Sequence, residues 1–110
     1  MNTRQQNGSS ADGRGVLITG CSSGIGQATA VKSAEHGFTV FATVQKEADA
    51  ENLRNLNMVN LVPVCPVDLT NLDHITNAAK IVTNELNRRD KNGLYALINN
   101  AGAVRQRLSN

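Results

Sequence analysis

Apolar residues gather in four short runs, and each run has the length and composition of a β-strand. The runs are rich in valine, isoleucine, leucine or phenylalanine, and they span residues 15–19, 38–44, 61–65 and 94–98. Longer stretches with helical patterning separate them, at residues 25–36, 46–55 and 72–89. Strands that alternate with helices predict an α/β fold built on a parallel, doubly wound sheet.

The side chains that should face the sheet follow from the spacing within each helix. Gly37 is a typical C-cap of the first helix, and Asn71 is a typical N-cap of the third. The third strand contains Pro63, which cannot donate to a neighbouring strand and therefore suits a sheet edge. The expected buried positions are Ala28, Ala30 and Ala34 in the first helix, Ala48, Leu53 and Leu56 in the second, and Ile75, Ala79, Val82 and Leu86 in the third.

A glycine-rich turn, Thr19-Gly20-Cys21-Ser22-Ser23-Gly24-Ile25-Gly26, joins the first strand to the first helix. Gly20 permits a tight turn, Gly24 permits close approach of the backbone to a ligand, and Gly26 removes a side chain where helix and strand meet. The free N–H groups and the dipole of the new helix favour a pyrophosphate, and Ser22 and Ser23 add hydroxyl groups. We expect a dinucleotide-binding turn that includes Ile25.

Two other interpretations of this turn remain open. Gly20 to Gly24 fits G-x-S-x-G, the nucleophile elbow of serine hydrolases, which would make Ser22 a nucleophile. An elbow normally follows several strands, whereas here only about fifteen mostly polar residues precede the first one. Cys21 stands at a helix N-terminus that can lower a thiol pKa, which would suit a redox role. We expect instead that Cys21 and Cys65 are reduced thiols.

The glycine spacing is G-x-x-x-G-x-G, and this turn resembles the cofactor loop of the short-chain dehydrogenase/reductase family. A second motif, Asn99-Asn100-Ala101-Gly102, follows the fourth strand about eighty residues later and resembles a hallmark of the same family. The resemblance implies a Rossmann-like sheet of strand order 3-2-1-4. It also implies that the backbone of Asn100, Ala101 and Gly102 borders the cofactor, while Asn99 braces the central sheet.

The end of the second strand bears on the choice between NAD and NADP. Val44 occupies the place where NAD-preferring members of the family carry Asp, and Gln45 stands where many NADP-preferring members carry Arg. Lys46 adds a positive charge, although it is equally well explained as a solvated surface residue. The missing acid favours NADP(H) slightly over NAD(H). Asp68-Leu69, after the third strand, matches the family's adenine border, although Asp68 alone would suit a turn or cap.

The resemblance covers residues 15–103, which correspond to the N-terminal half of a family member. The family's catalytic Ser and Tyr-x-x-x-Lys are not found: Tyr95 is the only tyrosine, and Asn99 stands where the Lys would be. We therefore interpret Tyr95 as a core strand residue and expect no substrate turnover by this chain alone. We expect polar tails at residues 1–14 and 104–110, a sheet truncated after the fourth strand, and a tendency of that open strand to associate.

The leading hypothesis is the cofactor-binding part of an NAD(P)-dependent oxidoreductase that transfers hydride between nicotinamide and a carbonyl or secondary alcohol. The alternative is a truncated, non-catalytic protein that binds a nucleotide or pairs with full-length subunits. A net charge of +2 on 110 residues argues against a nucleic-acid or membrane partner. No signal-peptide pattern is present, so we expect a cytoplasmic protein. His36 and His74 lack neighbours at metal-binding spacing, and we expect no metal site.

Overall fold

Four parallel strands form one sheet in the order β3-β2-β1-β4, as the sequence predicts. The computed structural model describes residues 13–90 and 93–100. The strands are β1 (Gly15–Ile18), β2 (Thr39–Thr43), β3 (Leu61–Val64) and β4 (Leu94–Ile98). Pro63 lies in β3 at one edge of the sheet, in agreement with its missing backbone donor.

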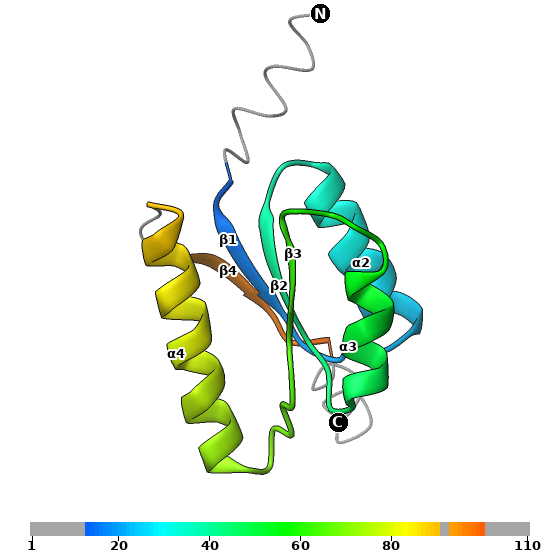
Figure 1. Ribbon diagram of the computed structural model, residues 1–110, viewed down its shortest axis with the longest axis vertical. Helices are drawn as coiled ribbons and strands as arrows, with labels where there is room; N and C mark the ends of the chain where they lie inside the picture. Colours follow the sequence, from blue (N-terminus) through cyan, green and yellow to red (C-terminus); the bar gives the residue numbers. More distant parts are fainter. Residues whose placement is uncertain (1–12, 91–92, 101–110) are drawn as a thin grey trace, which may run out of the picture.

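Helices cover both faces of the sheet (Figure 1). α2 (Gly24–Glu35) and α3 (Glu47–Arg54) lie on one face, and α4 (Leu72–Arg88) lies on the other. Each helix connects two parallel strands, so the chain returns to the same end of the sheet before every strand. The carboxyl ends of all four strands therefore meet at one rim of the sheet, and this rim carries the candidate site.

The buried faces of α2 and α3 differ in part from the prediction. α2 buries Gly26, Ala30 and Ala34, whereas Ala28 is exposed because it lies about 200° around the helix from Ala30. In α3 the prediction of Leu53 is confirmed. Ala48 and Leu56 are exposed, and Ala50 is buried instead, one turn before Leu53. A short polar helix has too few apolar residues for the pattern to fix its face.

α4 begins as expected, because the side chain of Asn71 accepts a hydrogen bond from the backbone N–H of His74 at 3.1 Å. Val82 and Leu86 are buried as predicted, and they pack against Phe41 of β2 and Val64 of β3. The other two predicted positions, Ile75 and Ala79, are exposed, and Ala78 is buried instead. Ile75 and Ala79 instead line a hollow between α4 and the sheet.

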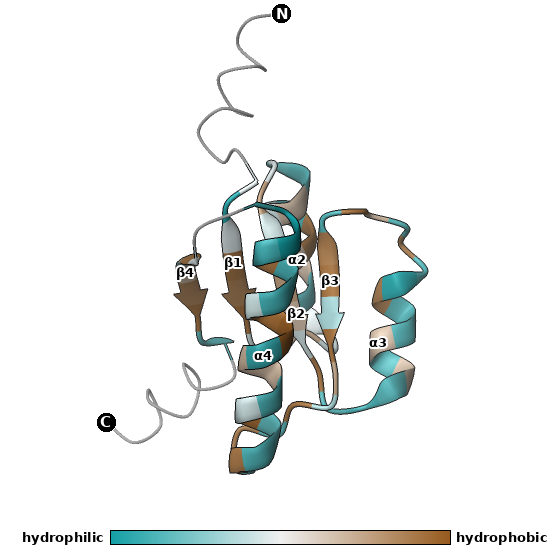
Figure 2. Cartoon of the chain, turned by 60° about the vertical axis from the view of Figure 1, so that its left-hand side comes forward, coloured by the Kyte–Doolittle hydropathy of each residue, from teal (hydrophilic) through white to brown (hydrophobic). Residues whose placement is uncertain are grey.

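β4 lies at the other edge of the sheet and consists mostly of hydrophobic residues (Figure 2), and several of them are exposed. Tyr95 is not a core residue, contrary to the prediction, because its side chain is 59% exposed. Its ring stacks on Phe38 with centroids 6.0 Å apart, and the Arg14 guanidinium lies 4.9 Å from the ring centroid. Arg14 is itself held in place, since its carbonyl oxygen accepts from the N–H of Thr39 at 2.9 Å. Residues 1–12 and 104–110 of the predicted tails lie outside the described residues.

Candidate cofactor site at the carboxyl ends of the strands

The glycine turn between β1 and α2 depends on its glycines for geometric reasons. Gly20 and Gly24 have φ angles of 67° and 62°, in the left-handed region that side chains with a Cβ rarely adopt. A Cβ on Gly26 would overlap the carbonyl oxygen of Gly20 and lie 2.7 Å from the Asn100 side-chain nitrogen. The tight-turn role of Gly20 is thus confirmed. Gly26 does remove a side chain from a close contact, but the contact is with Gly20 of the turn and with Asn100 rather than with a strand. A Cβ on Gly24 would meet open space, so its side of the turn is accessible.

Side chains at the start of α2 face outward. Ser22, Ser23 and Ile25 are all exposed, and Ile25 is 77% exposed. Ser23 is the N-cap residue, yet its hydroxyl makes no capping hydrogen bond. The first N–H groups of α2 therefore have no side-chain cap from this residue, which leaves the helix N-terminus suited to an anion.

Cys21 anchors the turn to the sheet. Its backbone N–H donates to the Thr43 carbonyl oxygen at 3.0 Å, and its thiol donates to the Ile18 carbonyl oxygen at 3.1 Å. The side chain is fully buried, and this burial raises the pKa of the Cys21 thiol to about 12. The hydrogen bond with the Thr43 backbone lowers this pKa less than burial raises it, so the interpretation of Cys21 as a low-pKa redox thiol is wrong.

The second motif reaches the same rim from β4. The Thr19 hydroxyl donates to the Asn99 side-chain oxygen at 3.0 Å, and the Thr19 N–H donates to the Ile98 carbonyl oxygen at 3.0 Å. The Asn100 side-chain nitrogen donates to the Gly20 carbonyl oxygen at 3.2 Å. The two motifs are therefore in direct contact, and Asn99 joins the ends of two neighbouring strands. The predicted cofactor residues Ala101 and Gly102 lie outside the described residues.

A hollow of about 510 Å³ opens at this rim, beside the glycine turn. Six of the predicted site residues line it: Gly20, Ser22, Gln45, Lys46, Asp68 and Leu69. The other described candidates do not line it: Ser23, Gly24, Ile25, Gly26 and Asn100. They lie on the turn itself, at the start of α2, or just beyond β4.

Several residues of this lining were not among the predicted site residues. Most of them are neighbours of predicted ones and could have been found from the rim position alone: Cys21, Thr43, Val67, Thr70 and Asn99. Asp49 is different, because it belongs to the first turn of α3 rather than to a strand end. The signal that could have found it is its spacing of three residues from Lys46, which places both near the same side of the helix start.

Asp68 forms a local turn and also lines the hollow. Its carboxylate accepts from the N–H and the hydroxyl of Thr70 at 2.9 and 2.7 Å, and these bonds lower the pKa of the Asp68 carboxyl. Its backbone N–H donates to the His74 ring at 3.2 Å. The turn interpretation and the site interpretation of Asp68 are therefore compatible.

Within the described residues, no group of three or more potential metal-binding side chains occurs.

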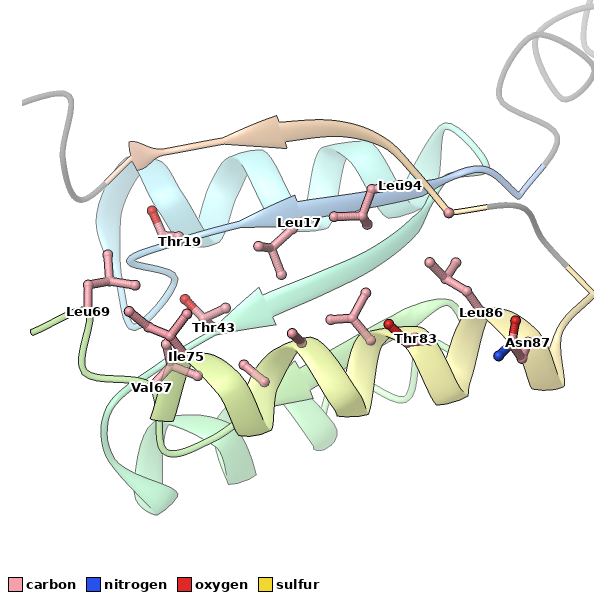
Figure 3. A pocket seen from close by; sticks show the side chains of 14 residues that line it. Leu17, Thr19, Thr43, Val67, Leu69, Ile75, Thr83, Leu86, Asn87 and Leu94 are labelled. Carbon is pink, nitrogen blue, oxygen red and sulfur yellow. The ribbon is translucent and has the colours of Figure 1, made fainter. Parts of the chain in front are cut away.

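A second, apolar hollow of about 300 Å³ lies between α4 and the strands β1 and β4 (Figure 3). Leu17, Leu94 and Leu86 point into it from three elements. It adjoins the first hollow, since Thr43, Val67 and Leu69 line both. No acidic or basic side chain is among the described residues that line it, so those residues offer no group for proton transfer there.

The hydrolase interpretation of Ser22 lacks a histidine base in the structure. Both histidines of the chain are described, and neither lines the hollow that contains Ser22. The His36 ring contacts the Lys32 carbonyl oxygen at 2.8 Å at the far end of α2, and the His74 ring contacts Asp68. A serine nucleophile of this type needs a base within hydrogen-bonding reach.

None of the helices in the described part of the chain has the length and apolar composition that crossing a membrane requires.

Comparison with known protein families gives a match over most of the chain. A family model described as short chain dehydrogenase matches residues 14–110. The oxidoreductase YbbO of Escherichia coli (strain K12), itself described as uncharacterized, is 35% identical over 89 residues. That alignment covers 81% of this chain and 30% of YbbO. NADPH-dependent 1-acyldihydroxyacetone phosphate reductase of Schizosaccharomyces pombe is 38% identical over 89 residues, covering 80% of this chain and 27% of the reductase.

A solved structure gives the same result in three dimensions. The crystal structure of a short chain dehydrogenase from Bacillus anthracis superimposes with a TM-score of 0.69 at 26% sequence identity. The superposition covers 82% of this chain and 35% of the bacterial enzyme. The chain thus spans about a third of the length of the proteins that it matches.

Proposed function

The chain belongs to the short-chain dehydrogenase family, and from that premise we propose that it forms the nicotinamide-dinucleotide-binding part of an oxidoreductase. The observation that carries the proposal is the contact between its two motifs. Asn100 reaches the carbonyl oxygen of Gly20, and Gly26 leaves room for this approach. The glycine turn, the start of α2 and the hollow beyond β2 therefore form one continuous surface at the rim of the sheet.

Each part of this surface suits one part of a dinucleotide. The N-terminus of α2 lacks a side-chain cap from Ser23 and suits the pyrophosphate. The hollow lined by Gln45, Lys46, Asp68 and Leu69 suits the adenosine half. The nicotinamide half would lie toward Asn99 and Asn100, at the carboxyl ends of β1 and β4.

A bound nicotinamide would supply or accept the hydride, and this chain's residues would bind and orient it. The hydride partner in the whole protein would be a carbonyl compound or a secondary alcohol, which is the reaction of the family. Asp49 and Asp68 line the hollow that suits the adenosine half. Tyr95 lies near the amino end of β4, away from the carboxyl ends of the strands. We therefore assign no general acid to this part of the chain, and its share of the mechanism is cofactor binding.

NADP(H) is the slightly favoured cofactor in this proposal. Val44 is 3% exposed and its apolar side chain cannot accept hydrogen bonds from the ribose hydroxyls. Lys46 lines the hollow and is exposed, so it can approach a phosphate. The Schizosaccharomyces pombe relative is named as NADPH-dependent, which agrees with this choice.

Calorimetric titration of the purified chain with NADH and NADPH tests the proposal. We expect saturable binding of at least one of them by the wild type, and loss of at least tenfold in affinity in Gly26→Ala, because the new methyl group would displace the Gly20 carbonyl. Glu35→Gln, an exposed change near the end of α2, is the control and should bind as the wild type does. Absence of binding to either nucleotide would contradict the proposal.

A second candidate function is a nucleotide-binding subunit that pairs with another chain. The outer strand β4 favours it, because four large apolar side chains there are at least 39% exposed: Leu94, Tyr95, Leu97 and Ile98. Nucleotide binding without carbonyl reduction, together with a mass above that of the monomer in light scattering, would support this second candidate. Carbonyl reduction by the purified chain would exclude it.

A further inference from the structure

Asp49 is an acidic residue in the adenosine half of the proposed site. It lies in the first turn of α3, it is half-buried, and it lines the same hollow as Gln45 and Lys46. Its N–H donates to the Lys46 carbonyl oxygen at 3.0 Å, so the two residues belong to one tight turn of backbone. The end of β2 carries the apolar Val44, and α3 thus provides the carboxylate that the strand end lacks.

The carboxylate of Asp49 differs from the other acidic groups nearby in its partners. Arg54 binds both Glu47 and Glu51 of α3, at 2.6 and 3.0 Å. Asp49 forms no ion pair within the described residues. Its charge therefore acts on the hollow without a neutralising partner.

The charges around the hollow decide what it can accept. Lys46 contributes one positive charge, while Asp49 and Asp68 contribute two negative charges. A ribose 2′-hydroxyl can donate a hydrogen bond to a carboxylate, whereas a 2′-phosphate is repelled by it and attracted by an ammonium group. Lys46 and Asp49 therefore act in opposite directions on the one group that distinguishes NADP from NAD.

We propose that Asp49 is a specificity-determining residue that opposes Lys46 and limits the preference of the site for NADP(H). This inference rests on the proposed function and names the two side chains that set the balance. Removal of the Asp49 charge should strengthen binding of the 2′-phosphate, and removal of the Lys46 charge should weaken it. Both effects should decrease as ionic strength rises, because the two side chains are reached by solvent.

Titration of the full chain and its variants with NAD⁺ and NADP⁺ tests this inference, since these ligands differ only in the 2′-phosphate. In Asp49→Asn we expect the ratio Kd(NADP⁺)/Kd(NAD⁺) to fall about tenfold, the size expected for loss of one repulsive charge nearby. In Lys46→Gln the ratio should rise by a similar factor. Asp49→Glu keeps the charge and should stay within about twofold of the wild type.

Asp73→Asn is the matched control, because it removes the same charge from the first turn of a different helix. It does not line the hollow and should leave the ratio unchanged. Circular dichroism verifies that each variant is folded. An unchanged ratio in Asp49→Asn, with both nucleotides bound, would overturn this inference alone, whatever the effect of Lys46→Gln. Failure of the wild type to bind either nucleotide would overturn the proposed function, and this inference with it.

Discussion

The hydroxyl of Thr19 donates a hydrogen bond to the side-chain oxygen of Asn99 at 3.0 Å, across 80 positions of sequence. Thr19 directly follows β1 and is 4% exposed, and Asn99 directly follows β4. A backbone bond from Thr19 to Ile98 lies beside it. This pair fixes the outer strand against the strand that leads into the glycine turn, so it links the position of the second motif to that of the first.

Removal of the Thr19 hydroxyl should destabilise the fold. We expect Thr19→Val to lower the free energy of unfolding by about 1 kcal/mol, because a buried hydrogen bond is lost while the side-chain shape is kept. Asn99→Ala should have an effect of similar size, and the double variant should be less than additive. Urea denaturation measures all three. The Thr39→Val change, in a buried threonine of β2, should be additive with Asn99→Ala and serves as the control.

The sheet was the most predictable part of the fold. Four apolar runs, Pro63 in the third run and the two motifs were sufficient to predict the strands and their order. The helix faces were less predictable, as Ala28, Ala48 and Ala79 illustrate. Alanine is compatible with both exposed and buried positions, so its spacing alone does not say which side of a helix meets the sheet.

Gly26→Ala should be the most damaging single change in the glycine turn. The added methyl group would overlap the Gly20 carbonyl oxygen and press against Asn100. Relief of this overlap requires a backbone shift, and we expect a loss of about 1–3 kcal/mol in stability. Differential scanning calorimetry gives the change in stability, which should accompany the loss of nucleotide binding.

Gly24→Asn is the matched comparison for Gly26→Ala. Gly24 needs a left-handed backbone, which asparagine adopts more readily than most residues, and a Cβ there meets open space. The cost should be about 1 kcal/mol or less. If Gly24→Asn were as destabilising as Gly26→Ala, the contact between Gly26 and Gly20 would not be the reason why position 26 requires glycine.

The two cysteines should differ strongly in reactivity. Cys21 is fully buried with a pKa of about 12, while Cys65 is half-buried and its pKa is raised less, by burial first and then by Glu47. Thiolate is the reactive form, so iodoacetamide at pH 8 should label Cys65 at least about tenfold faster than Cys21. Peptide mass mapping measures both rates. Equal rates in the folded protein would contradict the buried position of Cys21, and in urea the difference should disappear.

The residues of the candidate site that follow strands were predictable from the sequence, whereas the one on α3, Asp49, was not. The family resemblance identified Gln45, Lys46 and Asp68. Each of them follows a strand, and parallel strands bring their carboxyl ends to one rim. Asp49 reaches the hollow because α3 starts only four residues after the end of β2. The position of Asp49 depends on how α3 packs, and the pattern of apolar residues in the strands does not predict it.

Glu85 gives the fold a pH dependence that can be measured. Its carboxylate accepts hydrogen bonds from Arg88 and, at 2.6 Å, from Arg89, and these bonds lower the pKa of the Glu85 carboxyl from 4.5 to about 2. Arg89 also donates to the Val59 carbonyl oxygen at 3.1 Å, which ties the end of α4 to the segment before β3. The cluster should therefore stabilise the folded state wherever Glu85 is ionised.

We expect Glu85→Gln to lower the free energy of unfolding at pH 7 by about 1 kcal/mol, a modest value because water screens these partly exposed groups. The folded-state pKa lies below the unfolded one, so the contribution is complete above pH 4.5 and is lost as the pH falls toward 2. Urea denaturation between pH 7 and pH 3 should show wild type and variant converging. Glu35→Gln should show no such convergence. If the difference in free energy of unfolding between wild type and Glu85→Gln stayed constant with pH, the Glu85 cluster would be excluded as the source of that difference.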